Sequence, residues 1–402
     1  MPPFLFPPLV WAKIRPPSLL ITYNTIIILI LLILSYILPN TIIIDINNYF
    51  ICNPKQYITT IMSNLLQLQH TNYNNHNNNP NPTCQSLPPL QINHVPIFLL
   101  LALLTKNRYY PTQSHYHVVG LCVYPVKSCP GIPQESLTFT KSHGIKYDRG
   151  FVVLRRKKGS SASDVGASPG SALEVVTMRE CPFMSKVRVT LRAGSSPAVS
   201  LKYGGREASF LYEADDATRF DVELFRNKMT LQIVDGTRGL FPEDESMVVA
   251  RVLGGVKCRE DTKWQDCYPG GYGAGAVDGS QALVVFTSAL EDLNEGASRE
   301  IPVERFRPNI VLAGRGAAQR WEEDFVRELA FPGLGLSVNK PCHRCVLSTV
   351  DLDTGKFDKK MEPLKTLKKH RLIKKDGRFG DSPAFGLNCT AQGEGGEVRR
   401  GE

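Results

Sequence analysis

The chain has 402 residues, enough for two or three domains of ordinary size. Hydrophobic residues make up 42% of it and charged residues 21%, and the formal net charge is +9. There is no Gly-x-y period and no sustained heptad pattern, which excludes a collagen-like chain or a long coiled coil. The ten cysteines are too sparse for a disulfide scaffold, and no cleavable signal peptide is evident. We therefore expect mostly reduced thiols in a cytosol-facing environment.

The first 117 residues differ in kind from the remainder. The first glycine of the chain is Gly120, and residues 1–117 carry only five basic side chains and one acidic side chain. Residues 118–402 carry 42 basic and 37 acidic side chains. This surplus of five is small and is expected to be spread along the chain, which argues against a nucleic-acid partner.

An uncharged run of 21 residues, SLLITYNTIIILILLILSYIL, occupies residues 18–38. A membrane-spanning helix needs about 20 apolar residues, so the run predicts an N-terminal membrane anchor. The alternative is a hydrophobic translation of A+T-rich DNA ahead of a wrongly chosen gene start. Seven asparagines follow between Asn72 and Asn81, and they predict a disordered linker within residues 1–117.

Short runs rich in β-branched and aromatic residues recur from His117 onward, with Gly, Pro, Asp and Ser between them. Such runs predict strands, and their close spacing predicts a β-barrel or a sandwich. The expected strands are VVGLCVYPV, SLTFT, GFVVLR, LEVVTM, KVRVTL, SFLYE and MTLQIVD. Residues 157–172 predict a flexible hairpin tip, and a helix is expected after Asp215 and Asp216.

The following part of the chain mixes strands and one helix. Residues 236–279 are rich in glycine and hard to assign. The sequence ALVVFTSALEDLNE, residues 282–295, predicts a strand that runs into a helix. Ser288 is the expected N-cap of this helix, and Glu291 would complete a capping box.

Three further segments predict β structure towards the C-terminus. RPNIVLAG, residues 307–314, predicts a strand. Two hairpins are expected after it, one turning at residues 332–333 and the other at residues 353–355. The folded region is therefore predicted to be mainly β with a few helices (α+β).

The tetrapeptide Cys342-His343-Arg344-Cys345 allows several kinds of chemistry. A structural zinc site is disfavoured because it needs two more ligands at suitable spacing. A thioredoxin-type site is disfavoured because VLSTV, which follows, is strand-like rather than helical. One cysteine could instead be the single thiolate ligand of a soft metal held otherwise by an organic cofactor, with Arg344 favouring the thiolate. Two buried structural cysteines are the alternative.

Basic and hydroxyl side chains gather at the ends of predicted strands. They lie in residues 124–128 (YPVKS), 148–150 (DRG) and 305–309 (RFRPN). Lys and Arg at such positions can neutralise a phosphate, and Arg can do so with two parallel hydrogen bonds. Composition alone would make each of them a solvated surface charge.

Six motifs at these places occur in a fixed order: YPVKSC, YDRGF, FRPNIV, PCHRCVLSTVDLDTG, EPLKTLKKHR and SPAFG. Together they resemble the mitochondrial amidoxime-reducing component family, over roughly residues 118–396. The resemblance implies a MOSC N-terminal β-barrel domain at residues 118–235 and a MOSC β-barrel domain at residues 236–402. Relatives continue through one more strand, so the MOSC domain is expected to be truncated and to keep an unpaired edge.

The resemblance also implies a molybdenum enzyme. Cys345 falls on the family's metal ligand and would be the catalytic residue, with Cys342 a non-ligating neighbour. Thr287 and Ser288 are carried over although Phe286 stands where the family has serine. The residues implied to hold the molybdenum cofactor (Mo-molybdopterin), in a cleft between the two domains, are Lys127, Ser128, Arg149, Thr287, Ser288, Arg307, Asn309 and Arg344.

The activity implied is the reduction of N-hydroxylated compounds, such as amidoximes and hydroxylamines. Electrons would come from NADH through NADH-cytochrome b5 reductase and cytochrome b5. Residues 18–38 would anchor the protein in the outer mitochondrial membrane, with the catalytic domain facing the cytosol. The alternative is a cofactor carrier or sulfur-transfer protein without turnover, although cofactor sulfurases also have a pyridoxal-phosphate domain that residues 1–117 cannot form. A non-functional relative is a third reading.

Overall fold

The structure is a computed structural model of the whole chain. It describes residues 10–14, 113–141, 143–213, 218–224, 227–253, 256–257, 273–276, 279–314, 320–373 and 377–402. The expected membrane anchor at residues 18–38 and the Asn-rich segment lie outside these ranges. Within them, no helix is both long enough and apolar enough to cross a membrane.

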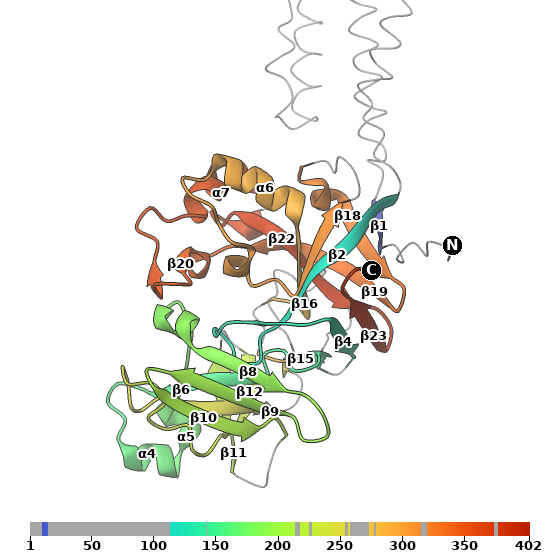
Figure 1. Cartoon of the computed structure of the whole chain (residues 1–402). Coiled ribbons are helices and arrows are strands. Elements are labelled where there is room, and N and C mark those ends of the chain that lie inside the picture. Colours follow the sequence, from blue (N-terminus) through green and yellow to red (C-terminus); the bar gives the residue numbers. More distant parts are fainter. Residues whose placement is uncertain are drawn as a thin grey trace, which may run out of the picture. The chain divides into compact units, whose positions relative to one another are not determined.

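The largest sheet has eight strands in the order β1-β18-β19-β22-β16-β17-β2-β3, and β1 pairs with β2 as well as with β18. Because of this second pairing, the sheet closes on itself (Figure 1). Its strands are β1 (Val10–Ile14), β2 (Gln113–Val123), β3 (Ile132–Pro133), β16 (Ala282–Phe286), β17 (Ile310–Gly314), β18 (Val326–Phe331), β19 (Leu334–His343) and β22 (Ala384–Ala391).

The strands β16 and β17 are parallel, and α6 (Thr287–Gly296) makes the crossover between them. All five residues of β16 are apolar and buried, as expected for a strand covered on both faces. The predicted strand-to-helix unit is thus confirmed. The predicted cap is wrong: α6 begins two residues earlier than predicted, Phe286 is its N-cap residue in place of Ser288, and no side chain caps it.

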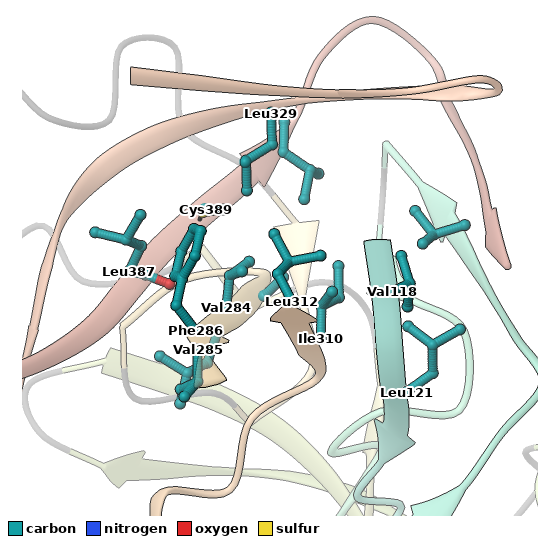
Figure 2. Close-up of a cluster of buried hydrophobic side chains, with 14 of the residues drawn as sticks. Val118, Leu121, Val284, Val285, Phe286, Ile310, Leu312, Leu329, Leu387 and Cys389 are labelled. Atoms are coloured by element: carbon teal, nitrogen blue, oxygen red, sulfur yellow. Dashed lines mark hydrogen bonds between the residues drawn. The ribbon is translucent and has the colours of Figure 1, made fainter. Parts of the chain in front are cut away.

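The core of this closed sheet is formed by apolar side chains from β2, β16, β17, β18 and β22 (Figure 2). Val284, Ile310 and Leu312 are fully buried there, together with Val118 from β2. Full burial of such a side chain stabilises the fold by about 1.5–3 kcal/mol. The pairing of β2 with β17 therefore joins residues almost 200 positions apart in one core.

A second group of strands forms a five-stranded and a three-stranded antiparallel sheet. The five are β11 (Arg219–Leu224), β12 (Asn227–Ile233), β13 (Val248–Leu253), β6 (Phe151–Arg156) and β7 (Leu173–Val176), in that order. The three are β10 (Arg206–Leu211), β9 (Ala198–Tyr203) and β8 (Arg188–Arg192). Alternate residues of β6 contribute to two separate cores, because successive side chains of a strand point to opposite faces.

The shorter elements include the predicted hairpins. β18 pairs with β19, and β20 (Val350–Asp351) pairs with β21 (Lys356–Phe357), so both predicted turns are confirmed. The remaining strands are β4 (Ser136–Thr140), β5 (Gly144–Ile145), β14 (Val256–Lys257), β15 (Gly273–Ala274) and β23 (Gly395–Arg399). β23 pairs with β4, and Val118 exchanges main-chain hydrogen bonds with Gly401 and Glu402.

The helices are short. They are α4 (Ala162–Ala167), α5 (Pro169–Ala172), α6, α7 (Leu364–His370) and the 3-10 turns η3 (Pro182–Lys186), η5 (Val303–Phe306), η6 (Glu322–Phe325), η7 (Val346–Thr349) and η8 (Gly377–Phe379). Two predictions are corrected by them and by β11. Residues 157–172 contain α4 and α5, and the segment after Asp215 and Asp216, which themselves lie outside the described residues, continues as a strand.

Candidate cofactor site

Tyr124, directly after β2, lies against two arginines. The guanidinium carbon of Arg149 is 4.6 Å from the centre of its ring and that of Arg307 is 4.3 Å from it, within the range of a cation–π contact. The Tyr124 hydroxyl donates to the carbonyl of Pro308 over 3.1 Å. Burial raises the pKa of Tyr124 well above its ordinary value, so the phenol stays protonated. The ring thus positions two cations without adding a charge.

Asp148 ties the segments around this ring together. Its Oδ1 accepts from the main-chain N–H of Tyr124 over 2.8 Å and from Nδ2 of Asn309 over 3.1 Å. Its Oδ2 accepts from Nη1 of Arg149. The Oδ1 of Asn309 in turn accepts from Arg149 over 3.2 Å and from the N–H of Leu283 over 3.2 Å. The motifs YPVKSC, YDRGF and FRPNIV therefore meet at one place in the fold.

The main chain at this place is held in an uncommon conformation. Ser128, Arg149 and Arg307 have φ angles of 67°, 49° and 57°, in the left-handed region that only glycine adopts freely. Such residues persist only where the surroundings enforce them, and they cluster at functional sites. Here the N–H of Arg149 donates to the carbonyl of Tyr124 over 2.7 Å, and that of Arg307 donates to Glu304 over 3.0 Å. Three of the residues expected to hold the cofactor are thus held in this conformation.

Arg307 has a hydrogen-bond donor that nothing in the described protein satisfies. Its Nη1 donates to the carbonyl of Cys129 over 2.6 Å, while its Nη2 is buried and has no partner among the described residues. Burial lowers the pKa of Arg307, yet a guanidinium stays charged in proteins. A buried unpaired donor is costly, more so on a charged group. An anion beside Nη2 would remove this cost, so the residues present fit the phosphate of a pterin cofactor.

Lys127 and Ser128 extend the same site. Lys127 is 5% exposed, and its Nζ donates to the carbonyl of Ala276 over 2.8 Å. Ser128 is 4% exposed. The N–H of Lys127 donates to Phe151 over 2.8 Å, which joins the turn after β2 to the beginning of β6. Both residues are thus buried, and the hydrogen-bonded turn after β2 holds them in place.

Arg344 and Cys345 lie next to this site through Phe306, the neighbour of Arg307. Nε and Nη2 of Arg344 donate to the carbonyl of Phe385 over 2.9 and 2.7 Å, and its Nη1 donates to Phe306 over 3.1 Å. The rings of Phe306 and Phe385 stack with their centres 4.0 Å apart. Arg344 therefore holds two segments beside Cys345, and its predicted contact with the cofactor stays a prediction.

The two cysteines of the tetrapeptide differ in exposure. Cys345 is exposed and directly precedes η7, whose Ser348 donates to the Cys345 carbonyl through its N–H over 3.1 Å and its hydroxyl over 2.9 Å. Cys342 is half-buried and packs against the core of the closed sheet. All six cysteines among the described residues are free thiols. Only Cys345 of the pair is thus exposed enough to meet a ligand from outside.

No group of three or more His, Cys, Asp or Glu side chains among the described residues is placed to hold a metal ion. A metal at Cys345 would need its other ligands from a cofactor. Soft ligands such as thiolates suit that role. The donor set therefore fits a metal bound by one protein thiolate and by cofactor sulfurs.

Thr287 and Ser288 lie apart from the other expected residues. They are half-buried in the first turn of α6, after the end of β16. Asn309 instead bonds to Leu283, near the start of β16. Within the described residues the two groups thus border opposite ends of one strand, and the roles of Thr287 and Ser288 stay predictions.

The structure adds residues that the sequence did not single out. Asp148 and the Tyr124 ring organise the arginines, and Phe385 receives Arg344. Gly386 has φ 75°, and a Cβ there would lie 2.7 Å from the carbonyl oxygen of Val284 and 3.4 Å from Arg344. All four residues lie within the motifs YPVKSC, YDRGF and SPAFG, so the motifs indicated the segments that contain them. Their contacts, some spanning more than 180 positions, were not readable from the motifs.

Comparisons with known proteins agree with this architecture. Residues 115–236 match the MOSC N-terminal beta barrel domain, and residues 272–402 match the MOSC domain. The fold is therefore that of a MOSC protein with an N-terminal β-barrel domain.

Several characterised proteins are similar to this chain. It is 35% identical over 289 residues to mitochondrial amidoxime reducing component 2 of Rattus norvegicus, covering 67% of this chain and 77% of the rat protein. It is 27% identical over 286 residues to the Macaca fascicularis protein of the same name, covering 68% and 79%. The chain belongs to the MOSC family of the mitochondrial amidoxime-reducing components. A molybdenum cofactor sulfurase of Oryza sativa subsp. japonica is 25% identical over 320 residues, covering 73% of this chain and 35% of the rice protein.

Proposed function

We propose that this protein is a molybdenum-cofactor-dependent reductase of N-hydroxylated compounds such as amidoximes and hydroxylamines. The observation that carries the proposal is the buried, unpaired Nη2 of Arg307, in the site built around Tyr124. This donor would be satisfied by a bound anion. The exposed Cys345 also supports the proposal, because a thiolate is a protein ligand that suits such a metal. Its neighbour Arg344 bonds to Phe306, the residue before Arg307.

Each residue has a proposed part. Arg307 and Arg149 would bind the cofactor's phosphate, and Lys127, Ser128 and Asn309 would position the pterin. Cys345 would be the metal ligand, with Arg344 fixing the segments on either side of it. When bound, the molybdenum cofactor would supply the two-electron redox chemistry. The chain itself would hold and orient the cofactor and the substrate.

The electron supply and the location are also proposals. We expect electrons from NADH, delivered by NADH-cytochrome b5 reductase through cytochrome b5. We further propose attachment to a mitochondrial membrane through residues 18–38, supported by the 21-residue uncharged run and by the names of the relatives.

The decisive experiment compares Cys345→Ala with the matched variant Cys342→Ala in the cofactor-loaded full chain. Molybdenum content is measured by mass spectrometry, and benzamidoxime reduction is measured with dithionite and with cytochrome b5 and its reductase. We expect Cys345→Ala to lose both metal and activity, because the thiolate ligand is gone. Cys342→Ala should keep the metal. Wild-type molybdenum stoichiometry in Cys345→Ala would contradict the ligand assignment, and metal-loaded wild type without activity would contradict the reductase.

A cofactor carrier or sulfur-transfer protein without turnover is the second candidate. The exposure of Cys345 and the similarity to a molybdenum cofactor sulfurase favour it. A carrier would pass its cofactor to an apo-molybdoenzyme and would not reduce benzamidoxime even with dithionite. A reductase would do the reverse, so the two assays together separate the candidates.

A further inference from the structure

One segment near the C-terminus of the folded region carries a local surplus of positive charge. Residues 351–375 contain nine Lys and Arg side chains and four acidic ones, a surplus of five. A second basic stretch, residues 141–158, has seven Lys and Arg side chains and one acidic one. Some of its cations are paired, for example Lys141 with Glu394 and Arg155 with Glu174. The described lysines of residues 351–375, all exposed, are Lys356, Lys359, Lys360, Lys365, Lys368 and Lys369.

These six residues, here called the lysine face, point outward because the segment buries its other side. α7 turns Leu364, Thr366 and Leu367 inward, which leaves its three lysines exposed. No lysine of the face forms an ion pair with any described residue. Of the four acids in the segment, only Asp353 is both exposed and without an ion pair among the described residues. Asp351 and Asp358 pair with Arg299 over 2.9 and 2.8 Å. Glu362 is 2% exposed. The acids within the segment thus do not pair with the lysine face.

The lysine face borders the proposed metal ligand. α7 contacts η7, and η7 begins directly after the exposed Cys345. β20 and β21, where Lys356 lies, follow η7 without a break in the chain. A partner seated on the lysine face would therefore cover the surface next to Cys345.

We propose that the lysine face is the docking surface for an acidic patch on the protein that delivers electrons. This deepens the proposed function and rests on it. Reduction of an N–OH group to N–H consumes two electrons and two protons and releases water. A one-electron donor such as cytochrome b5 must therefore bind, be oxidised and leave twice per turnover. Complementary charge serves such brief encounters, because it raises the association rate more than the lifetime of the complex.

A protein fits this surface better than a membrane. Insertion into the lipid interface needs a broad apolar face beside the cations. Met361, 43% exposed, is the one large exposed hydrophobic side chain that the described part of residues 351–373 offers. Such a surface is polar and positive, as expected for a transient protein contact.

The test uses the full chain in two variants that change the net charge by the same amount. The first is Lys365→Glu/Lys368→Glu/Lys369→Glu. The control is Lys158→Glu/Arg188→Glu/Arg192→Glu, three exposed cations of the N-terminal β-barrel domain. Affinity for the soluble haem domain of cytochrome b5 is measured by calorimetry at about 0.02 M and about 0.3 M salt, since salt screens exposed charges. Binding to vesicles of phosphatidylcholine with phosphatidylserine is measured in parallel.

We expect the lysine-face variant to bind cytochrome b5 at least about tenfold more weakly at low salt, with little remaining salt dependence. The affinity of the control for cytochrome b5 should stay within about twofold of the wild type. Vesicle binding should be the same in the lysine-face variant and the wild type. Equal losses in both variants, unchanged cytochrome b5 binding, or a loss confined to vesicle binding would each overturn the proposal. Reduction of benzamidoxime by dithionite needs no docking, so its failure would count against the proposed function alone.

Discussion

At the scale of single residues, Asp148 is the side chain on which the cofactor site depends. It is 4% exposed and accepts hydrogen bonds from Tyr124, Asn309 and Arg149. Removing one partner from a buried charged network leaves the others unpaired, which costs about 3–5 kcal/mol. We predict a loss of this size in the free energy of unfolding for Asp148→Ala, measured by urea denaturation.

The matched control is Asp353→Ala, because Asp353 is exposed. It should change the free energy of unfolding by no more than about 0.5 kcal/mol. Asp148→Asn keeps the acceptor for Tyr124 and should lie between the two. Equal stabilities of Asp148→Ala and Asp353→Ala would show that the network does not hold the site together.

The residues of this site were partly predictable. The motifs placed Lys127, Arg149, Arg307 and Asn309 at strand ends, and the structure brings them together. The role of the Tyr124 ring was not predictable, because its contacts with Arg149 and Arg307 depend on how β2 and β17 pair. Short motifs name the residue types, whereas long-range pairing decides which of them touch.

At the scale of elements, η6 contains a carboxyl group that is buried without a hydrogen-bond partner among the described residues. Glu323 is 1% exposed, and neither carboxylate oxygen has a partner among the described residues. Burial, with a smaller contribution from the charge of Asp324, raises the pKa of Glu323 to about 8. In the unfolded chain the group titrates near 4.3. The folded protein therefore favours the protonated form over most of the physiological range.

This shift makes stability depend on pH in a defined direction. Below about pH 4 the carboxyl is protonated in both states and carries no penalty. As pH rises from about 4 to about 8, the unfolded state ionises first and the folded protein loses stability. We predict that the stability of Glu323→Gln relative to the wild type increases throughout this window. The difference in the free energy of unfolding should reach roughly 2–4 kcal/mol at pH 7 and level off above pH 8.

Thermal unfolding between pH 4 and pH 9 checks this prediction. Glu300→Gln is the control, because Glu300 is exposed. Its difference from the wild type should stay flat. Parallel curves for Glu323→Gln and the wild type would mean that Glu323 is ionised in the folded protein.

Elements were predictable where one pattern acts alone. Runs of apolar β-branched residues identified β6 and β16, and turn residues identified the β18–β19 hairpin. The β-branched residues of η7 predicted a strand, and this prediction is wrong. The segment forms a 3-10 turn, in which the hydroxyls of Ser348 and Thr349 donate to the carbonyls of Cys345 and Val346 over 2.9 and 2.8 Å. Such local hydroxyl bonds compete with strand formation in β-branched sequence.

Helix starts show the same competition. α6 begins after Phe286 because that ring is 1% exposed in the core, and its packing overrides the preference for Ser288 as a cap. α4 has a capping box of Ser161 and Asp164, a signal that was present in a segment assigned by its composition as flexible. Packing in the first case and local hydrogen bonding in the second decided the outcome.

At the scale of the whole molecule, the sheets do not divide where the sequence domains do. β2, within the residues matched to the N-terminal β-barrel domain, pairs with β17 of the MOSC domain. β4 pairs with β23 at the other end of the chain. β13, beyond the expected boundary at residue 235, pairs with β12 and β6 of the N-terminal β-barrel domain. Sequence similarity identifies the two families, but the pairing of strands interleaves them.

This interleaving predicts that the two halves depend on each other for folding. A cut between β13 and β15 would give fragments 1–265 and 266–402. The second fragment would lack β2, whose Tyr116, Val118 and Leu121 are buried in the core that contains β16 and β17. It would also expose the edge of β17, and such an edge is prone to aggregation. We predict that neither fragment alone shows a cooperative thermal transition.

Co-expression of the two fragments supplies the control, because it restores every pairing while keeping the cut. The fragments should then co-purify, and the complex should melt in one transition by calorimetry, since shared sheets and a shared core make unfolding a single event. A fragment 266–402 that melts cooperatively on its own would show that β2 is dispensable to the MOSC core. The cofactor site, with Tyr124 on one fragment and Arg307 on the other, would then be an interface between independent domains rather than part of one folding unit.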